Sequence, residues 1–162
     1  MSERRDGRAA AIVLLQEVEG SLKDPSAEPS TIVTPYSALG GRDAVLGLVE
    51  RFYDIMEQSE PALAAVHELD QDGKISRRNR DRFGLFLIGW LGGPDDYVKQ
   101  HGHPRLRMRH ARVLVNLQQR DAWLRCMFRA MDERAVPAAT QGFLRQRFSE
   151  VADFLRNVEP TE

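Results

Sequence analysis

Apolar residues recur every three or four positions over most of the chain, which is the spacing of one face of an α-helix. One stripe begins after residue 43 and consists of Val45, Leu48, Val49, Phe52 and Met56. The next stripe consists of Phe83, Phe86, Leu87, Trp90 and Leu91, and it stops at the turn residues 92–94 (GGP). No strand-like alternation of apolar and polar residues is found, so the pattern predicts an all-α fold.

Other segments predict further helices and one linker. Helices are expected over residues 8–22 and 61–67, after Pro104, and over two longer stretches at about 116–134 and 138–157. The stripes of the two longer helices are Leu117, Leu124, Phe128 and Met131, and Leu144, Phe148, Val151 and Leu155. Residues 24–35 (DPSAEPSTIVTP) are rich in Pro, Ser and Thr, which predicts a linker.

Composition and charge narrow the class of protein. A chain of 162 residues with 42% apolar and 29% charged residues has the size of one globular domain. Its 23 basic and 24 acidic residues nearly balance, so neither nucleic acid nor a membrane surface is an expected partner. Cys126 is the only cysteine, which excludes an internal disulfide and fits a reducing cytoplasm. The apolar stretch 9–15 is too short for a membrane span, and no secretory signal is expected.

Three of the four histidines, His101, His103 and His110, lie within ten residues of each other. Zinc is one candidate ligand, but a structural zinc site normally takes four ligands and no thiolate lies nearby. Exposed surface histidines are a second possibility. A third follows from the short helix after Pro104, where His110 lies on a partly apolar face and arginines are spaced three and four residues apart. Such a helix can offer an imidazole to the iron of a heme while its guanidinium groups pair with the heme propionates.

Residues 68–79 (ELDQDGKISRRN) resemble the middle of a calcium-binding loop. The loop has acidic residues and a glycine at suitable positions, but Asn79 replaces the bidentate Glu that should end it. Several arginines also crowd the segment. We therefore expect a polar, exposed connection rather than a calcium site.

Four aromatic side chains, Tyr53, His67, Phe83 and Trp123, lie on or next to the helical stripes. Phe83 is expected in the core. The other three carry a polar N–H or O–H group that needs a partner when it is buried. Three such donors around one cavity would suit a diatomic ligand with negative charge on its outer atom. Cys126 has no nearby base and is expected to be an inert, buried thiol.

Several runs of the sequence, taken together and in order, resemble the group II truncated hemoglobins. These runs are residues 36–41 (YSALGG), 51–53 (RFY), 89–94 (GWLGGP), 102–110 (GHPRLRMRH) and 120–127 (RDAWLRCM), with Tyr97 between them. The resemblance covers about residues 35–157. It implies a two-over-two helical sandwich around one heme b, preceded by an N-terminal extension at 1–34 and followed by a tail at 158–162.

The resemblance also implies site residues. His110 would be the proximal iron ligand, and Trp123 and Tyr53 would face the ligand on the distal side. His67 stands where many relatives carry Tyr or Phe, and it is expected to donate a hydrogen bond there. Asn79 is expected to face the ligand from the following helix.

Three further residues are expected around the heme itself. Phe83 would lie against it, and Tyr97 and Arg109 would hold its propionates. The sequence also departs from the family pattern. Residues 68–76 form a longer connection, and residues 111–113 (ARV) replace the usual small residue, Pro and Phe after the iron ligand.

The function implied is the binding of O2 and other diatomic ligands at histidine-ligated ferrous heme, in a monomer or homodimer of the oxygen-carrier type. One alternative is a heme-dependent redox enzyme, a peroxidase or nitric oxide dioxygenase working with a reductase. Another is a heme-free helical binding module that uses the metal-like features of the chain.

Overall fold

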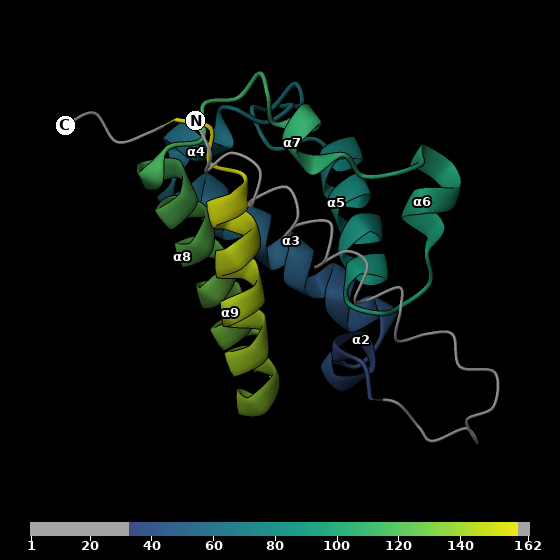
Figure 1. Cartoon of the computed structure of the whole chain (residues 1–162). Coiled ribbons are helices and arrows are strands. Elements are labelled where there is room, and N and C mark those ends of the chain that lie inside the picture. The colour runs from purple at the N-terminus through teal and green to yellow at the C-terminus, as the bar shows by residue number, and fades with distance from the viewer. Residues whose placement is uncertain (1–32, 159–162) are drawn as a thin grey trace, which may run out of the picture.

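The computed structural model describes residues 33–158, and this part of the chain folds almost entirely into α-helices, as the apolar spacing predicts. The helices are α2 (Pro35–Leu39), α3 (Arg42–Ser59), α4 (Pro61–Ala64), α5 (Arg77–Trp90), α6 (Asp96–His101), α7 (Leu106–Arg109), α8 (Leu117–Glu133) and α9 (Ala138–Phe154) (Figure 1). The only β-type pairing among these residues is an isolated bridge between Leu69 and Ile75. None of the helices described is both long and apolar enough to cross a membrane.

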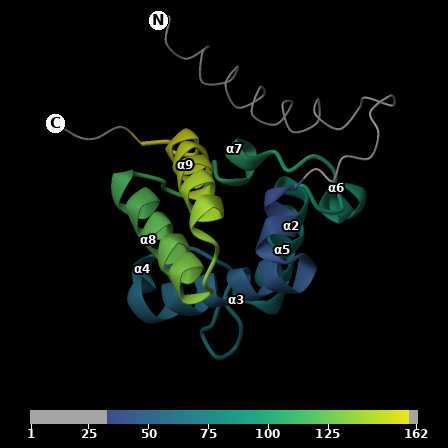
Figure 2. The ribbon, with the colours of Figure 1, turned by 90° about the horizontal axis from the view of Figure 1, so that it is seen from below.

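Helix α3 is the element on which the others assemble. It packs against α8 along one side and against α5 along another, while α9 packs on α8 and α6 packs on α5. Figure 2 shows α8 and α9 together on one side of the molecule, α2, α5 and α6 on the other, and α7 between the two groups. This arrangement is the two-over-two pairing that the sequence predicts.

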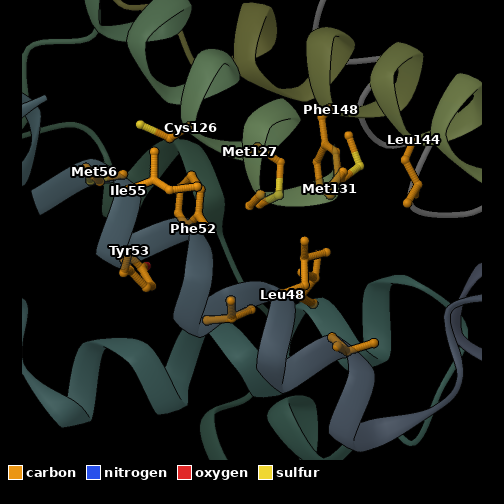
Figure 3. Close-up of a cluster of buried hydrophobic side chains, with 14 of the residues drawn as sticks. Leu48, Phe52, Tyr53, Ile55, Met56, Cys126, Met127, Met131, Leu144 and Phe148 are labelled. Atoms are coloured by element: carbon orange, nitrogen blue, oxygen red, sulfur yellow. The ribbon is translucent and has the colours of Figure 1, made fainter. Parts of the chain in front are cut away.

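The core forms where α3 meets α8 and α9 (Figure 3). The predicted stripe of α3 is fully buried, because its residues lie on the face that contacts both partner helices. Its partners on α8 and α9 are chiefly Met127, Met131, Leu144 and Phe148. Cys126 lies in this core at 1% exposure, and burial raises the pKa of its thiol to about 11, so the expectation of a buried thiol is confirmed.

The double glycine after α5 permits a close approach between α2 and the end of α5. The backbone N–H of Tyr36 donates to the carbonyl of Leu91 at 2.9 Å. Gly92 has φ +97°, and a Cβ on Gly93 would lie 2.7 Å from the Tyr36 ring. Side chains at these two positions would therefore be strained or would push α2 away from α5.

Several predicted boundaries are wrong by a few residues. The helix predicted over 61–67 ends at Ala64, because the backbone then changes to the tighter i→i+3 hydrogen bonds. The helix expected at Pro104 begins at Leu106, since Arg105 adopts the left-handed conformation at φ 47°. The last helix ends at Phe154 rather than at Asn157. Helices α2 and α6 were not predicted, and the helix expected over 8–22 lies outside the described residues, as does most of the linker.

Candidate functional site

His110 follows directly after the four-residue helix α7 and is half-buried. Its Nδ1 lies 2.6 Å from the carbonyl oxygen of Leu106, one turn earlier. A carbonyl oxygen can only accept, so Nδ1 carries the proton and Nε2 keeps a free lone pair. This is the tautomer that an imidazole needs in order to bind a metal, with its second nitrogen oriented by the backbone.

Tyr53 lies on α3, at 4% exposure, and leaves the helix on the side away from Cys126 and Met127 (Figure 3). Its hydroxyl oxygen accepts a hydrogen bond of 3.0 Å from Nδ2 of Asn79 on α5. Burial raises the pKa of the Tyr53 phenol, so the hydroxyl stays protonated at every physiological pH. Because its oxygen is the acceptor in the bond to Asn79, its hydrogen remains available for another acceptor.

Two features fix Asn79 at the first turn of α5. The side chain of Ser76 caps the helix by accepting from the backbone N–H of Asn79 at 3.1 Å. The next residue, Arg80, is buried and donates to Glu57 at 2.7 Å, and it also pairs with two further carboxylates of α3. The start of α5 is therefore held against α3, and Asn79 is held beside Tyr53.

An aromatic cluster connects α3, α5, α8 and α9. The ring of Phe83 lies 5.7 Å from Tyr53 and 6.3 Å from Trp123, both edge to face. Phe52 lies among these three rings, 5.1 Å from Trp123. Phe148 of α9 joins the cluster at 5.6 Å from Trp123. Phe83 and Trp123 are only partly buried, and the indole N–H of Trp123 donates to no other described residue.

His67 lies after α4, with its ring 5.7 Å from that of Tyr53. Its Nδ1 is 2.9 Å from the carbonyl oxygen of Leu63, so Nδ1 is the donor and the neutral ring has only an acceptor at Nε2. Burial lowers the pKa of His67 below its usual value, and it outweighs the hydrogen bonds to the backbone, which act in the opposite direction. A neutral His67 therefore cannot donate from Nε2.

Among the described residues, Tyr97 reaches this cluster through Phe86, whose ring stacks on that of Phe83 at 6.4 Å, and Arg109 forms no contact with its rings. Tyr97 is buried on α6, where its ring packs on Phe86 at 5.8 Å and on His101 at 5.0 Å. Arg109 is exposed, and its Nε donates to the carbonyl of Pro104 at 2.9 Å. Its guanidinium forms no ion pair with any carboxylate in residues 33–158, so it is free to meet an anion.

The structure thus brings Tyr53, His67, Asn79, Phe83 and Trp123 into one connected group. It leaves Tyr97 and Arg109 outside the contacts of that group. Sequence reasoning placed Phe52 and Phe148 on the apolar stripes but did not expect them to pack against Trp123, and it missed the role of Arg80 beside Asn79. Within residues 33–158, no three His, Cys, Asp or Glu side chains lie close enough to hold a metal ion together.

Comparison with known proteins agrees with this geometry. The family model described as "Bacterial-like globin" matches residues 34–157. The "Group 2 truncated hemoglobin YjbI" of Bacillus subtilis (strain 168) is 34% identical over 128 residues, which cover 79% of this chain and 92% of the relative.

Solved structures are also similar. A cold-adapted truncated hemoglobin from Pseudoalteromonas haloplanktis TAC125 is 39% identical at a TM-score of 0.72, covering 78% of this chain and all of the other. A group II 2-on-2 hemoglobin from Agrobacterium tumefaciens is 35% identical at a TM-score of 0.73, covering 82% of this chain and all of the other.

The chain therefore belongs to the bacterial-like globins and, among them, to the group II truncated hemoglobins. Its cofactor is heme, and its class of ligand is O2 and other diatomic molecules. The residues present fit the cofactor. His110 offers a free Nε2, and the partly buried rings of Phe83 and Trp123 are apolar groups that suit contact with a porphyrin.

Proposed function

We propose that this globin binds O2 and other diatomic ligands reversibly at a heme iron held by Nε2 of His110, in an oxygen-binding role of the carrier type. The observation that carries the proposal is the hydrogen bond from His110 Nδ1 to the carbonyl of Leu106, at 2.6 Å. It fixes both the tautomer and the orientation of the ring. When bound, heme supplies a ferrous iron with one position for a diatomic ligand.

The distal side chains have distinct tasks in this proposal. Tyr53 donates its free hydroxyl hydrogen to the diatomic ligand, while Asn79 holds the phenol oxygen in place. Trp123 donates its indole N–H, which has no other acceptor among the described residues. His67 is neutral at physiological pH and contributes an acceptor, so its task differs from the donor role expected from sequence.

The remaining contacts concern the porphyrin and its edge. We assign Phe83 to the apolar contact with the porphyrin, because its ring lies between those of Tyr53 and Trp123 and is only partly buried. Tyr97 and Arg109 are assigned to the propionates. Arg109 supports this assignment by having no carboxylate partner among residues 33–158.

The proposal keeps the predicted organisation of the chain, with a globin domain at 35–157, an extension at 1–34 and a tail at 158–162. A cytoplasmic location stays a prediction that rests on the lone Cys126. A monomer or homodimer stays the expected assembly.

The test is the rate of oxygen dissociation, measured beside peroxide turnover in wild type, Tyr53→Phe and Trp123→Phe. We expect slow dissociation in wild type and acceleration in at least one variant, because each loses a donor. If neither variant changed the rate, these side chains would not reach the ligand. If wild type released oxygen quickly and the variants lost peroxide turnover instead, a redox enzyme with a reductase would replace the proposed carrier.

A further inference from the structure

Asn157 lies just beyond the end of α9, and its hydrogen bonds to the described residues all go to the segment 110–115, which begins with His110. Its side-chain Nδ2 donates to the carbonyl of His110 at 3.2 Å and to that of Val113 at 2.8 Å. Its Oδ1 accepts from the backbone N–H of Val115 at 2.9 Å, and its own N–H donates to the carbonyl of Val115 at 3.0 Å. One residue therefore makes four hydrogen bonds across a sequence separation of more than forty residues.

Apart from its own turn bonds, in which Ala111 donates to Met108 at 3.3 Å and Val113 donates to His110 at 3.0 Å, the segment bound by Asn157 has little support among the described residues. Helix α7 is only four residues long, and Ala111, Arg112 and Leu114 are exposed. A surface hollow of about 560 Å³ opens beside residues 111–114 and is also lined by Asn157. This is also the place where residues 111–113 depart from the family pattern. Among residues 33–158, no side chain fills the hollow, so hydrogen bonds contribute most to fixing the path of the backbone there.

The hydrogen bonds of Asn157 do not cap the end of α9. The end of that helix is closed by its own backbone, where Leu155 donates to Val151 at 3.0 Å and Arg156 donates to Asp153 at 3.2 Å. Both polar atoms of the Asn157 side chain point away from α9 and toward the segment that carries His110. Removing the side chain therefore leaves the hydrogen bonds of α9 intact.

We propose that Asn157 is a positioning residue for the proximal histidine, and that it sets the direction in which His110 presents Nε2 to the iron. The inference rests on the proposed function. The imidazole of His110 is held from one side by the carbonyl of Leu106, and its backbone is held from the other side by the amide of Asn157. Partners of the ligating side chain itself, as the carbonyl of Leu106 is here, typically change metal affinity by about 10- to 100-fold when they are removed, and Asn157 acts on the same ligand through its backbone, with an effect expected at the lower end of that range.

The test uses the full-length, heme-loaded protein and two substitutions of Asn157. Asn157→Ala removes the three side-chain bonds. Asn157→Asp keeps the shape of the side chain and the hydrogen bond from the N–H of Val115. It replaces the donating Nδ2 by a carboxylate oxygen, which cannot donate to the carbonyls of His110 and Val113. The matched control is Asn116→Ala. This substitution removes the side-chain cap of α8, in which Oδ1 of Asn116 accepts from the backbone N–H of Gln119 at 3.0 Å, and Asn116 forms no hydrogen bond with His110.

The readouts are the iron–histidine stretching band of the ferrous, ligand-free protein and the rate of heme loss. We expect the band to shift or broaden in both Asn157 variants, with heme loss about tenfold faster, and to stay unchanged in the control. A band unchanged in both variants, or moved equally by Asn116→Ala, would overturn the role of Asn157 while leaving the proposed function standing. If Asn157→Ala does not fold, the comparison of Asn157→Asp with Asn116→Ala, by the same band and the same rate of heme loss, tests the role of Asn157. A wild type without the band would overturn both proposals.

Discussion

Asn79 donates a hydrogen bond of 3.0 Å from Nδ2 to the hydroxyl oxygen of Tyr53, which lies 26 residues earlier on a different helix. This bond decides which atom of Tyr53 is left for a ligand. With its oxygen occupied as an acceptor and its pKa raised by burial, the phenol offers its hydrogen. In the proposed site, Asn79 would therefore act on the ligand through Tyr53, whereas the resemblance to the family implies that Asn79 faces the ligand itself.

A double-mutant cycle on this pair tests that relationship. Tyr53→Phe should speed oxygen dissociation by about tenfold, which corresponds to the loss of one hydrogen bond of about 1.4 kcal/mol. Asn79→Ala should speed it by less, because Tyr53 remains but is less well oriented. In the Asn79→Ala background, the effect of Tyr53→Phe should shrink. Independent, additive effects of the two substitutions on the rate would show that the two side chains are not coupled.

Arg80 should be the most sensitive charged residue for stability. Its side chain is 8% exposed and pairs with Glu50, Asp54 and Glu57, so its removal leaves three carboxylates facing each other. We expect Arg80→Met to lower the free energy of unfolding by about 3 kcal/mol, since breaking a buried ion pair costs much more than breaking an exposed one.

Arg77→Met is the matched control in urea unfolding. Arg77 pairs with Glu50 and Asp81 but is 61% exposed, so its loss should cost about 0.5 kcal/mol. Equal losses for the two arginines would mean that the start of α5 does not depend on the buried pairs of Arg80.

A methyl group on Gly93 should weaken the contact between α2 and α5. The Cβ of Gly93→Ala would lie 2.7 Å from the Tyr36 ring and 2.9 Å from the Ile88 side chain. Overpacking of this kind typically costs about 1–3 kcal/mol, which thermal unfolding would show as a lower Tm. Gly142→Ala is the control, because its Cβ meets nothing within 4 Å on α9 and should raise Tm slightly. A Tm unchanged by Gly93→Ala would contradict the close approach.

Acid should destabilise the protein partly through His67. Burial lowers the pKa of His67 in the folded state, so the unfolded chain binds its proton first as pH falls. The contribution of a neutral, buried His67 to stability is complete above about pH 6.5, and it is lost as pH falls from there toward the folded-state pKa, by at most about 1.4 kcal/mol per pH unit.

Urea unfolding of apoprotein at pH 7.5 and 5.5 would measure this loss. His67→Phe should reduce the difference in stability between the two pH values, whereas His103→Ala, at an exposed position, should not. An equal pH dependence in wild type and His67→Phe would show that His67 does not carry the effect.

The spacing of apolar residues along the chain predicted the long helices, because each long helix buries a face on which apolar side chains recur every three or four positions. Val45, Leu48, Phe52 and Met56 are all confirmed in the core. Helix α6 was missed because six residues are too few for such a period to be seen. Short helices of this kind depend on packing, and α6 packs on α5 through Tyr97 and Phe86.

The candidate site was predicted less completely than the core. Tyr53 and Trp123 were singled out because each adds a polar group to an aromatic side chain on a helical stripe, whereas the place of Phe83 against the heme is implied only by the resemblance to the family. Arg80 and Asn157 were missed, since their importance depends on partners more than twenty residues away along the chain. His67 was found, but its tautomer depends on the carbonyl of Leu63, which only the folded backbone places.

The central claim is that His110 ligates the heme iron, and the absorption spectrum of heme-loaded protein tests it most directly. We predict a Soret band in wild type that His101→Ala and His103→Ala leave unchanged, whereas His110→Ala loses or shifts it. The free Nε2 of His110, opposite the bond from Nδ1 to Leu106, is the physical reason. A wild type with no Soret band after heme addition, or an unchanged band in His110→Ala, would contradict the account.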